Sequence, residues 1–513
     1  MANEIKTNGD EHGMDLGEGV TVYAPGVHAL IVHHTSYENS ENHRKEQGDP
    51  EGLGPALGEV ELQDRHTIEI TLDREPAQPT DQNPPLTETE FRIMVDNPAD
   101  GSTVYGVYQD ETGACSFHFG KRSSRRRHLG LEGLSLIFTI PMSLVSVPDA
   151  TDGRPGLFGR LGRKVVKLIY GKVILEAAYG NILLAAAEWW EKRRYGPPLF
   201  HGGGVEDVLG ATRQPYTGWG GLGPKTDNLL LLHGTFSSTR GAFGELLKNP
   251  AARTALNARY GNRILGFDHP TVSKPVAGNA TDFLDTLPPR AEPYNFDVLV
   301  HSRGGLLARA IHDMPLIHLQ RCSHQATWVH PPRVKVNFRK VIFVGTPNLG
   351  TDLADPDNLP TLLGCFATML NAMPSSGCVL IGGILKCVAA VARGGLNHLP
   401  GLADQALYAN GATGDFLTTL NGLALPPGRT ASYHAIRASN VPDSRLLRTA
   451  AKAVRKVCFG NRANDLVVPT HSMAALGVSG SVAGGVFEYR NQPVHHVNYF
   501  AQPPTWATIL NWL

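Results

Sequence analysis

The sequence predicts an α/β domain with a mostly parallel sheet, preceded by a smaller β-rich domain. From Asn228 onward, short apolar runs of strand length alternate with segments of helix length. This alternation is typical of a parallel sheet covered by helices on both faces. From about Val20 to Gly120, β-branched and aromatic runs alternate instead with clusters of Gly, Pro, Asn and Asp, which is typical of antiparallel strands. A chain of 513 residues also exceeds the size at which one hydrophobic core usually keeps growing.

Three segments follow from these patterns. Residues 1–130 are predicted to form the β-rich domain, residues 131–225 a helical connector with a glycine-rich linker, and residues 226–513 the α/β domain. The connecting helix is expected from Leu157 to Trp190, where apolar residues recur at helical spacing among basic ones. The linker is expected from His201 to Lys225 because this stretch is rich in glycine. Strands are expected at the runs NLLLL, RILGF, FDVLV, KVIFV, SYHAIRA and GVFEY.

Charge, cysteine content and hydropathy exclude several classes of function. Lys plus Arg and Asp plus Glu are equal at 47 each, so no overall field attracts nucleic acid, and no nucleic-acid partner is expected. The first residues are polar and acidic, unlike a secretory signal, and within the segment Leu157–Trp190 charges interrupt every window long enough to span a bilayer. We therefore expect a cytoplasmic protein, with non-standard export left open. The six cysteines lack metal-site spacing, so neither a metal nor a cofactor is expected.

Two basic segments are notable, one at the end of the predicted β-rich domain and one in the predicted connector. Lys121–His128 is interpreted as a solvated loop, with contact to phosphates or lipid headgroups as the alternative. The helix expected from Leu157 to Trp190 is basic and amphipathic, and is interpreted as a helix that joins and packs two domains. A peripheral membrane contact through this helix is the alternative. The sequence does not predict the oligomeric state.

The segment FDVLVHSRGGLLARAI carries the clearest sign of chemistry. An apolar run ends at Val300, Ser302 follows, then Gly304 and Gly305, and then a helical pattern. Strand, tight turn and helix in this order are the context of a nucleophile elbow, which exposes a serine hydroxyl on a strained turn at the end of a central strand. The two glycines would let the helix approach the strand closely. Val300 departs from the pattern G-x-S-x-G, which has glycine at that position.

A second motif, His233-Gly-Thr235, follows the apolar run NLLLL directly. The backbone amides of Thr235 and Arg303 are predicted to point at the oxygen of a tetrahedral intermediate and to stabilise its charge. His233 is interpreted as a residue that orients this loop. His269, in the run GFDHP, is interpreted as part of a strand-end turn packed near the site, rather than as a metal ligand or half of an acid–base pair.

An acid and a base are expected after the serine, in that order along the chain. Asp465 lies in the loop-like segment ANDLVVP, and His495 and His496 follow the strand-like run GVFEY. A carboxylate there would hold the imidazole in the required tautomer while the imidazole removes the serine proton. Asp443 and Asp404 are competitors for the acid, but neither is in a strand-end context.

Six motifs together resemble the lipase-type branch of the α/β-hydrolase superfamily: HGTFS, HSRGG, VGTPNLGT, HLPGLADQA, NDLVVP and HHVNYF. In this branch the chain is similar to bacterial lipases, esterases and GPI-inositol-deacylase-like proteins. The resemblance covers roughly Asn228 to Leu513. It implies an α/β-hydrolase fold and a serine esterase or lipase with Ser302 as nucleophile and Asp465 as acid. The pattern H-x-N-Y-F selects His496 over its neighbour as base.

The resemblance also implies a cap over the site, at about residues 351–428. This segment is too long for a turn and is rich in apolar and small residues, so an apolar small-molecule or lipid ester is the expected substrate. An ordinary pair of core helices is the alternative for this segment. For the function, the alternatives are an acyltransferase, a thioester or lipid-amide hydrolase on the same triad, and a non-catalytic scaffold. The intact order of serine, acid and histidine argues against the scaffold.

Overall fold

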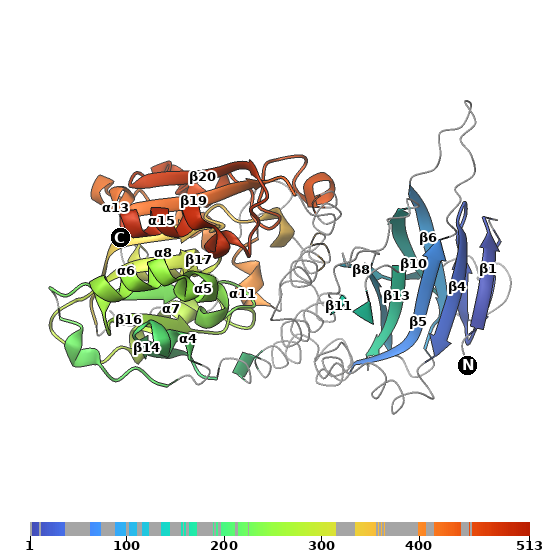
Figure 1. The fold of residues 1–513 in the computed structure, drawn as a ribbon, viewed down its shortest axis with the longest axis horizontal. Helices are drawn as coiled ribbons and strands as arrows, with labels where there is room; N and C mark the ends of the chain where they lie inside the picture. Colours follow the sequence, from blue (N-terminus) through green and yellow to red (C-terminus); the bar gives the residue numbers. More distant parts are fainter. Residues whose placement is uncertain are drawn as a thin grey trace. The chain divides into compact units, whose positions relative to one another are not determined.

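Separate hydrophobic cores divide the chain into two units in the computed structural model (Figure 1). Residues 1–179 form most of the first unit, and residues 180–513 form most of the second. The structure describes residues 3–9, 12–35, 62–72, 88–98, 102–109, 115–122, 135–143, 155–156, 159–160, 164–171, 188, 191–192, 196–210, 214–223, 225–313, 334–354, 358, 361, 364, 399–406, 415–442, 451 and 454–513. Each unit is described by itself.

The first unit is built from two antiparallel sheets whose inner faces share one core. Core side chains alternate along the strands, as in β4, where Ala29 and Ile31 are buried. One sheet has the order β1 (Asn3–Asn8), β4 (His28–Thr35), β5 (Leu62–Leu72), β13 (Lys164–Gly171), β7 (Thr103–Gln109) and β8 (Cys115–Phe119). The other has the order β2 (Met14–Gly17), β3 (Val20–Tyr23), β6 (Glu88–Asp96), β10 (Ser135–Ser143) and β9 (Lys121–Arg122). A separate two-residue pair is formed by β11 (Pro155–Gly156) and β12 (Gly159–Arg160).

The expected helix from Leu157 to Trp190 is wrong where the structure describes it. Residues 164–171 form strand β13, which pairs with β5 on one side and β7 on the other. Val166 and Leu168 point into the core between the two sheets. The run KVVKLIYG is short and rich in β-branched and aromatic residues, so it favours a strand once two partner strands are available. The alternative of a peripheral membrane contact depended on a basic amphipathic helix, and residues 164–171 form a strand instead. Of the basic patch, Lys121 and Arg122 form β9, and the rest lies outside the described residues.

The second unit contains a seven-stranded sheet with six parallel strands and one antiparallel edge strand. Its order is β14 (Leu199–Gly203), β16 (Ile264–Asp268), β15 (Leu229–Leu232), β17 (Tyr294–His301), β18 (Val336–Val344), β19 (Tyr433–Asn440) and β20 (Gly485–Gln492). All six strands expected from apolar runs are confirmed. The antiparallel β14 was not expected. It lies partly in the stretch interpreted as a linker, and it places the start of the second unit before residue 226.

Helices cover both faces of this sheet, and each face has its own core (Figure 1). Consecutive residues of β15 alternate between the two cores, so Leu230 and Leu232 face one and Leu229 and Leu231 face the other. The first face is covered by α7 (Val276–Thr286), α8 (Gly304–His312) and α12 (Asp415–Asn421). The second is covered by α4 (Val205–Leu209), α5 (Thr239–Lys248), α6 (Pro250–Tyr260) and α15 (Pro503–Trp512). Two short helices are α11 (Pro400–Ala403) and α13 (Pro427–Ala431). In the part of the chain that the structure describes, no helix has the length and apolar character to cross a bilayer.

Most of the cap expected at about residues 351–428 lies outside the described residues, including nearly all of the two apolar stretches that suggested it. The described parts are residues 351–354, 399–406 and 415–428, with single residues between them. Thr351 pairs with Ala406 in a parallel bridge, which ties the beginning of this segment to its middle.

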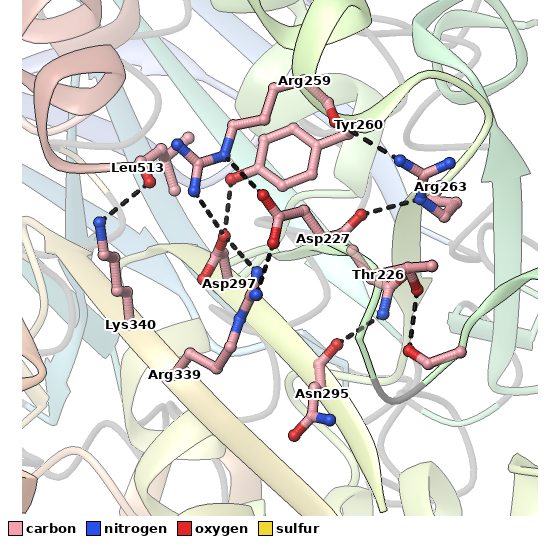
Figure 2. A network of polar contacts seen from close by, with 12 residues as sticks. Thr226, Asp227, Arg259, Tyr260, Arg263, Asn295, Asp297, Arg339, Lys340 and Leu513 are labelled. Atoms are coloured by element: carbon pink, nitrogen blue, oxygen red, sulfur yellow. Dashed lines mark hydrogen bonds and ion pairs between the residues drawn. The ribbon is translucent and has the colours of Figure 1, made fainter.

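An ionic network stabilises the sheet near the start of β15, away from the strand carboxyl ends (Figure 2). The carboxylate of Asp297 is 1% exposed and accepts hydrogen bonds of 2.8 Å from Tyr260 and from Arg339. Arg339 also bonds Asp227, which precedes β15. Because the buried carboxylate has a hydrogen-bonding phenol and a cation, its burial penalty is offset.

Helix α8 approaches β15 so closely that its first residue has to be glycine. A Cβ on Gly304 would stand 2.2 Å from the carbonyl oxygen of Leu232, and one on Gly305 would stand 2.3 Å from the side chain of Thr346. Both distances are shorter than real Cβ contacts, so the backbone would have to move at Gly304, and the Thr346 side chain or the helix would have to move at Gly305. The sequence-based expectation that these glycines allow close approach is confirmed.

We therefore expect Gly304→Ala to lower the free energy of unfolding by about 1–3 kcal/mol or more, because the clash is with backbone. Gly244→Ala in α5 is the matched control, since no atom lies within 4 Å of the added methyl. That substitution should raise the free energy of unfolding by about 0.5–1 kcal/mol, the usual gain of alanine over glycine inside a helix. Urea denaturation of both variants measures the two effects, and equal stabilities would contradict the packing argument.

The carboxyl end of α8 is held by a histidine that stays neutral. Nε2 of His312 accepts a 3.3 Å hydrogen bond from the Phe338 amide, and Nδ1 donates to the hydroxyl of Tyr433 at 3.2 Å. The Tyr433 hydroxyl donates in turn to Asp313. Burial, with a smaller contribution from Arg429, lowers the pKa of His312 to about 3. Protonation would remove the acceptor and leave a buried cation.

Because the pKa of His312 is lower in the folded state than in the unfolded chain, the unfolded chain binds the extra proton. The stabilisation is therefore present above pH 6.5 and is lost as the pH falls toward 3. His312→Gln keeps an acceptor near the Phe338 amide and removes this titration. Between about pH 5.5 and 4.5, we expect the free energy of unfolding to fall less steeply in the variant, by up to about 1.4 kcal/mol per pH unit. Equal slopes in denaturant titrations would contradict this.

Candidate active site

Ser302 occupies a tight turn between β17 and α8. Its φ is +54°, a left-handed conformation that is uncommon for a residue with a side chain. The turn is held by a 3.0 Å hydrogen bond from the Ser302 amide to the carbonyl of Val344 and by one from the Gly305 amide to the carbonyl of Ser302. The structure therefore has the strained strand–turn–helix geometry that the sequence predicts at this position.

Three side chains from the ends of three strands meet in one hydrogen-bonded chain. Ser302 follows β17, Asp465 lies in the loop after β19, and His496 lies after β20. Nε2 of His496 lies 2.9 Å from Oγ of Ser302, and Nδ1 lies 2.8 Å from Oδ2 of Asp465. The backbone amide of His496 also donates to the carbonyl of Asp465 at 2.9 Å. All three residues are 4% exposed or less. Parallel strands bring their carboxyl ends to one edge of a sheet, which explains the meeting.

The carboxylate of Asp465 accepts three further hydrogen bonds. The amides of Val467 and Val468 donate to Oδ1 at 3.0 and 2.7 Å, in a turn whose Leu466 has a φ of +80°. The hydroxyl of Tyr499 donates to Oδ2 at 3.0 Å, beside His496. Burial, reinforced by the negative charge of Asp465, raises the pKa of Tyr499 well above 10, so the phenol keeps its proton and remains a donor. Hydrogen bonds from protein groups thus replace the water that the buried carboxylate has lost.

The other candidates for the base and the acid, His495, Asp404 and Asp443, are not part of this hydrogen-bonded chain in the residues that the structure describes. The contacts to Ser302 and Asp465 are made by His496, whereas His495 uses its backbone amide to bond the side chain of Asn498 at 2.8 Å. Oδ2 of Asp404 accepts a 2.6 Å hydrogen bond from the first amide of α7. Asp443 lies outside the described residues.

His301 supports the backbone of His496. Its Nε2 donates a 2.8 Å hydrogen bond to the carbonyl of His496. Burial, with a smaller effect from His496 itself, lowers the pKa of His301 to about 3, so the ring is neutral at ordinary pH. A neutral ring adds no competing charge beside the His496 imidazole.

The loop after β15 packs directly against the serine. A Cβ on Gly234 would stand 2.6 Å from Cβ of Ser302, so only glycine allows this approach. The amide of Phe236 is occupied, because it donates to Oγ1 of Thr271 at 3.1 Å. Among the residues that the structure describes, the amides of Thr235 and Arg303 donate no hydrogen bond. Thr235 follows Gly234, which packs against Ser302, and Arg303 follows Ser302 directly in the chain.

His233 and His269 form a packed pair behind this loop. Their rings stack with centroids 4.3 Å apart, and the His269 amide donates to Nε2 of His233 at 3.2 Å. Burial lowers the pKa of His269 well below 6.5. Oδ1 of Asp268 accepts from both the amide and the hydroxyl of Thr239 at 2.7 Å. These contacts agree with the interpretation of the segment as a packed turn.

Sequence reasoning missed four residues that hold the site together: Glu191, His301, Gln405 and Tyr499. Gln405 lies in the motif HLPGLADQA and Tyr499 in HHVNYF, so both stood in segments already noted, but without an assigned role. His301 is adjacent to the serine. Glu191 lies in the run WWEKRR, and nothing in that run marks it as part of a site 80 residues away.

The strand order and the position of the elbow after β17 agree with the α/β-hydrolase fold expected from the motifs. Structural comparison finds similarity to lipase 1 from Pelosinus fermentans, with 13% identity over 56% of this chain and 96% of that one, and a TM-score of 0.36. EstA from Clostridium botulinum has 12% identity over 56% of this chain and 87% of that one, also with a TM-score of 0.36. The carboxylesterase CesB from Bacillus subtilis has 11% identity over 65% of this chain and 98% of that one, with a TM-score of 0.28. TM-scores this low do not establish an activity for the chain.

A comparison with curated proteins finds no significant match. At the level of sequence families, residues 211–513 match the family described as Domain of unknown function (DUF7379). The match spans more than half of the chain, including the seven-stranded sheet from β15 onward and every side chain of the Ser302–His496–Asp465 chain. The protein therefore belongs to the DUF7379 family.

Proposed function

We propose that the second unit is a serine hydrolase that cleaves carboxylic esters through an acyl-enzyme. The observation that carries the proposal is the hydrogen-bonded chain from Ser302 through His496 to Asp465, which begins on a turn with φ +54°. A serine hydroxyl is a weak nucleophile unless a neighbouring base removes its proton. Here the base lies 2.9 Å away and is itself oriented by a buried carboxylate.

In the proposed acylation step, Oγ of Ser302 attacks the ester carbonyl as Nε2 of His496 takes the hydroxyl proton. The carbonyl oxygen gains negative charge, which the amides of Thr235 and Arg303 stabilise. Collapse of the tetrahedral intermediate breaks the bond to the alkoxy oxygen, and the imidazolium of His496 gives its proton to that oxygen. Asp465 remains ionised and stabilises the imidazolium throughout.

In the deacylation step, water takes the place of the alcohol. His496 removes a proton from water, the hydroxide attacks the acyl carbonyl, and the Ser302 oxygen leaves with the proton returned by His496. The balance is one ester and one water to one acid and one alcohol. An ester with an apolar acyl chain is the proposed substrate, because the segment expected to cap the site is rich in apolar residues.

The proposal predicts hydrolysis of p-nitrophenyl esters, measured from acetate to palmitate. Ser302→Ala and His496→Ala should each lower kcat by about 10⁴-fold or more, since each removes a group that acts as part of a unit. His495→Ala is the matched control and should stay within a few-fold of the wild type, because the imidazole that bonds Ser302 and Asp465 is that of His496. The chain-length optimum separates a short-chain esterase from a lipase.

Folded protein that hydrolyses no ester in this series would contradict the proposal. So would wild-type turnover that persists in Ser302→Ala. Repeating the assay with an added alcohol separates hydrolysis from acyl transfer, because a transferase yields the new ester in place of the free acid.

Tyr499 is expected to tune the acid of this triad. Tyr499→Phe removes one of the donors to the Asp465 carboxylate and leaves its packing, so His496 is held less firmly. We expect kcat to fall by about 10–100-fold, within the range of one lost hydrogen bond to a charged group. Tyr489→Phe is the control, because its hydroxyl bonds Thr505 at 2.8 Å, away from the triad. Equal kcat values for the two variants, measured on the best p-nitrophenyl ester, would contradict a role for Tyr499.

A further inference from the structure

The segment HLPGLADQA has no role in the acyl-transfer steps, yet it contacts both sides of the proposed oxyanion hole. The carbonyl oxygen of Gly401 accepts two hydrogen bonds, from Nε of Arg303 at 3.0 Å and from Nε2 of Gln405 at 3.0 Å. Nε2 of Gln405 also lies 3.0 Å from Oγ1 of Thr235. A continuous path of hydrogen bonds thus runs from the side chain of Arg303 to the side chain of Thr235.

The orientation of the Gln405 amide follows from its partners. A carbonyl oxygen can only accept, so the end that faces Gly401 must be the NH₂ group and not the amide oxygen. Both hydrogens of that NH₂ group are then used, one on Gly401 and one on Thr235. Gln405 is 6% exposed, so water offers little competition for these bonds.

The Arg303 side chain is anchored at a second point. Its Nη2 donates a hydrogen bond to the carbonyl of Lys274 at 2.8 Å, and the residue is fully buried. Burial lowers the pKa of Arg303 to about 10, while the charges of Asp404 and Glu191 act in the opposite direction. The guanidinium therefore stays charged at neutral pH, and a buried charge is retained only where its hydrogen bonds offset the loss of water.

Gly401 is itself held rigidly. Its amide donates to the carbonyl of Val272 at 3.0 Å, and a Cβ at this position would stand 2.3 Å from the carbonyl oxygen of Thr271. The strand-end segment 271–273 is in turn bound by the buried carboxylate of Glu191. That carboxylate accepts from the amides of residues 271–273 and from the hydroxyls of Thr271 and Ser273, at 2.5–3.2 Å.

We propose that Arg303, Gly401 and Gln405 form a brace that fixes Thr235 relative to the Ser302 turn. The brace sets the separation of the two backbone amides that receive the oxyanion, one from residue 235 and one from residue 303. This inference rests on the proposed function, and it assigns Gln405 and the side chain of Arg303 as positioning residues.

The physical reason is that the two amide donors belong to loops far apart in the sequence. Their shared target is a single oxygen whose charge appears only in the transition state, so both donors have to stand at about 2.7–3.1 Å from one point. A displacement of about 1 Å can cost about 10²-fold in rate. Loss of the brace should therefore lower kcat and leave ground-state binding nearly unchanged.

The test compares Gln405→Leu, Arg303→Met and the double variant on the best p-nitrophenyl ester. Each single variant should lower kcat by about 10–100-fold with KM within about threefold. Because both act through Gly401, the double variant should lose much less than the product of the two single effects. Arg303→Lys retains a cationic donor and should keep more activity than Arg303→Met. Gln502→Leu, which removes a bond to the Asn498 carbonyl outside the brace, is the control and should stay within about twofold of the wild type.

A second measurement uses covalent labelling of Ser302 by a fluorophosphonate, with thermal unfolding as the check on folding. If the variants melt like the wild type and are labelled more slowly, the brace is supported even where ester turnover is slow. Wild-type kcat and labelling rates in Gln405→Leu would overturn the brace and leave the proposed function intact. A raised KM with unchanged kcat, or multiplicative effects in the double variant, would also overturn it. Wild-type protein that neither hydrolyses esters nor is labelled would overturn both proposals.

Discussion

The tight turn at Ser302 is the constraint on which the site depends. A residue with a side chain at a positive φ costs of order 1 kcal/mol or more, so the surroundings must hold it. The Ser302 amide donates a hydrogen bond to the Val344 carbonyl of the neighbouring strand, and helix α8 begins directly after the turn. Because the turn is tight, the start of α8 meets the end of β15, and the following loop places Gly234 against the serine. One strained residue thus brings Ser302 next to the loop that contains Thr235, the residue proposed to supply one of the two oxyanion donors.

The two ends of the sheet each hold a buried carboxylate, but the residues that bind it belong to different kinds of element. Near the start of β15, the buried Asp297 is bound by Arg339 and Tyr260, all of which belong to regular strands or helices (Figure 2). Such charged hydrogen bonds fix how the elements sit beside one another. At the carboxyl ends, Ser302, Asp465 and His496 all stand in loops, and the amides of Val467 and Val468 and the hydroxyl of Tyr499 bond the Asp465 carboxylate. The strands and helices near the start of β15 therefore support loops at the opposite end of the sheet, and residues in such loops can vary without disturbing the regular elements.

Sequence patterns predicted the strands of the second unit that contain an apolar run, and missed or misread elements without a clear run. Of the six strands expected in the second unit, β15, β16 and β17 are almost wholly buried, whereas β20 buries only Tyr489, yet each strand formed where its run lies. β14 is short and two of its five residues are glycine, so no apolar run marks it, and its place is set by pairing with β16. The run around Val166 fits a helical period as well as a strand period, and partners far along the chain, β5 and β7, decided the outcome.

The same distinction applies to the site. The order of serine, acid and histidine could be predicted because each follows a strand, and a parallel sheet brings strand ends together. The residues that hold the oxyanion loop follow no such rule: Glu191 acts on a segment 80 residues later, and Gln405 on Thr235, 170 residues earlier. Glu191 bonds backbone amides, and Gln405 bonds a backbone carbonyl. Because nearly every residue has these groups, the sequence does not mark which of them are the partners. Their roles are therefore determined by tertiary structure, even though the chemistry they support can be recognised from motifs.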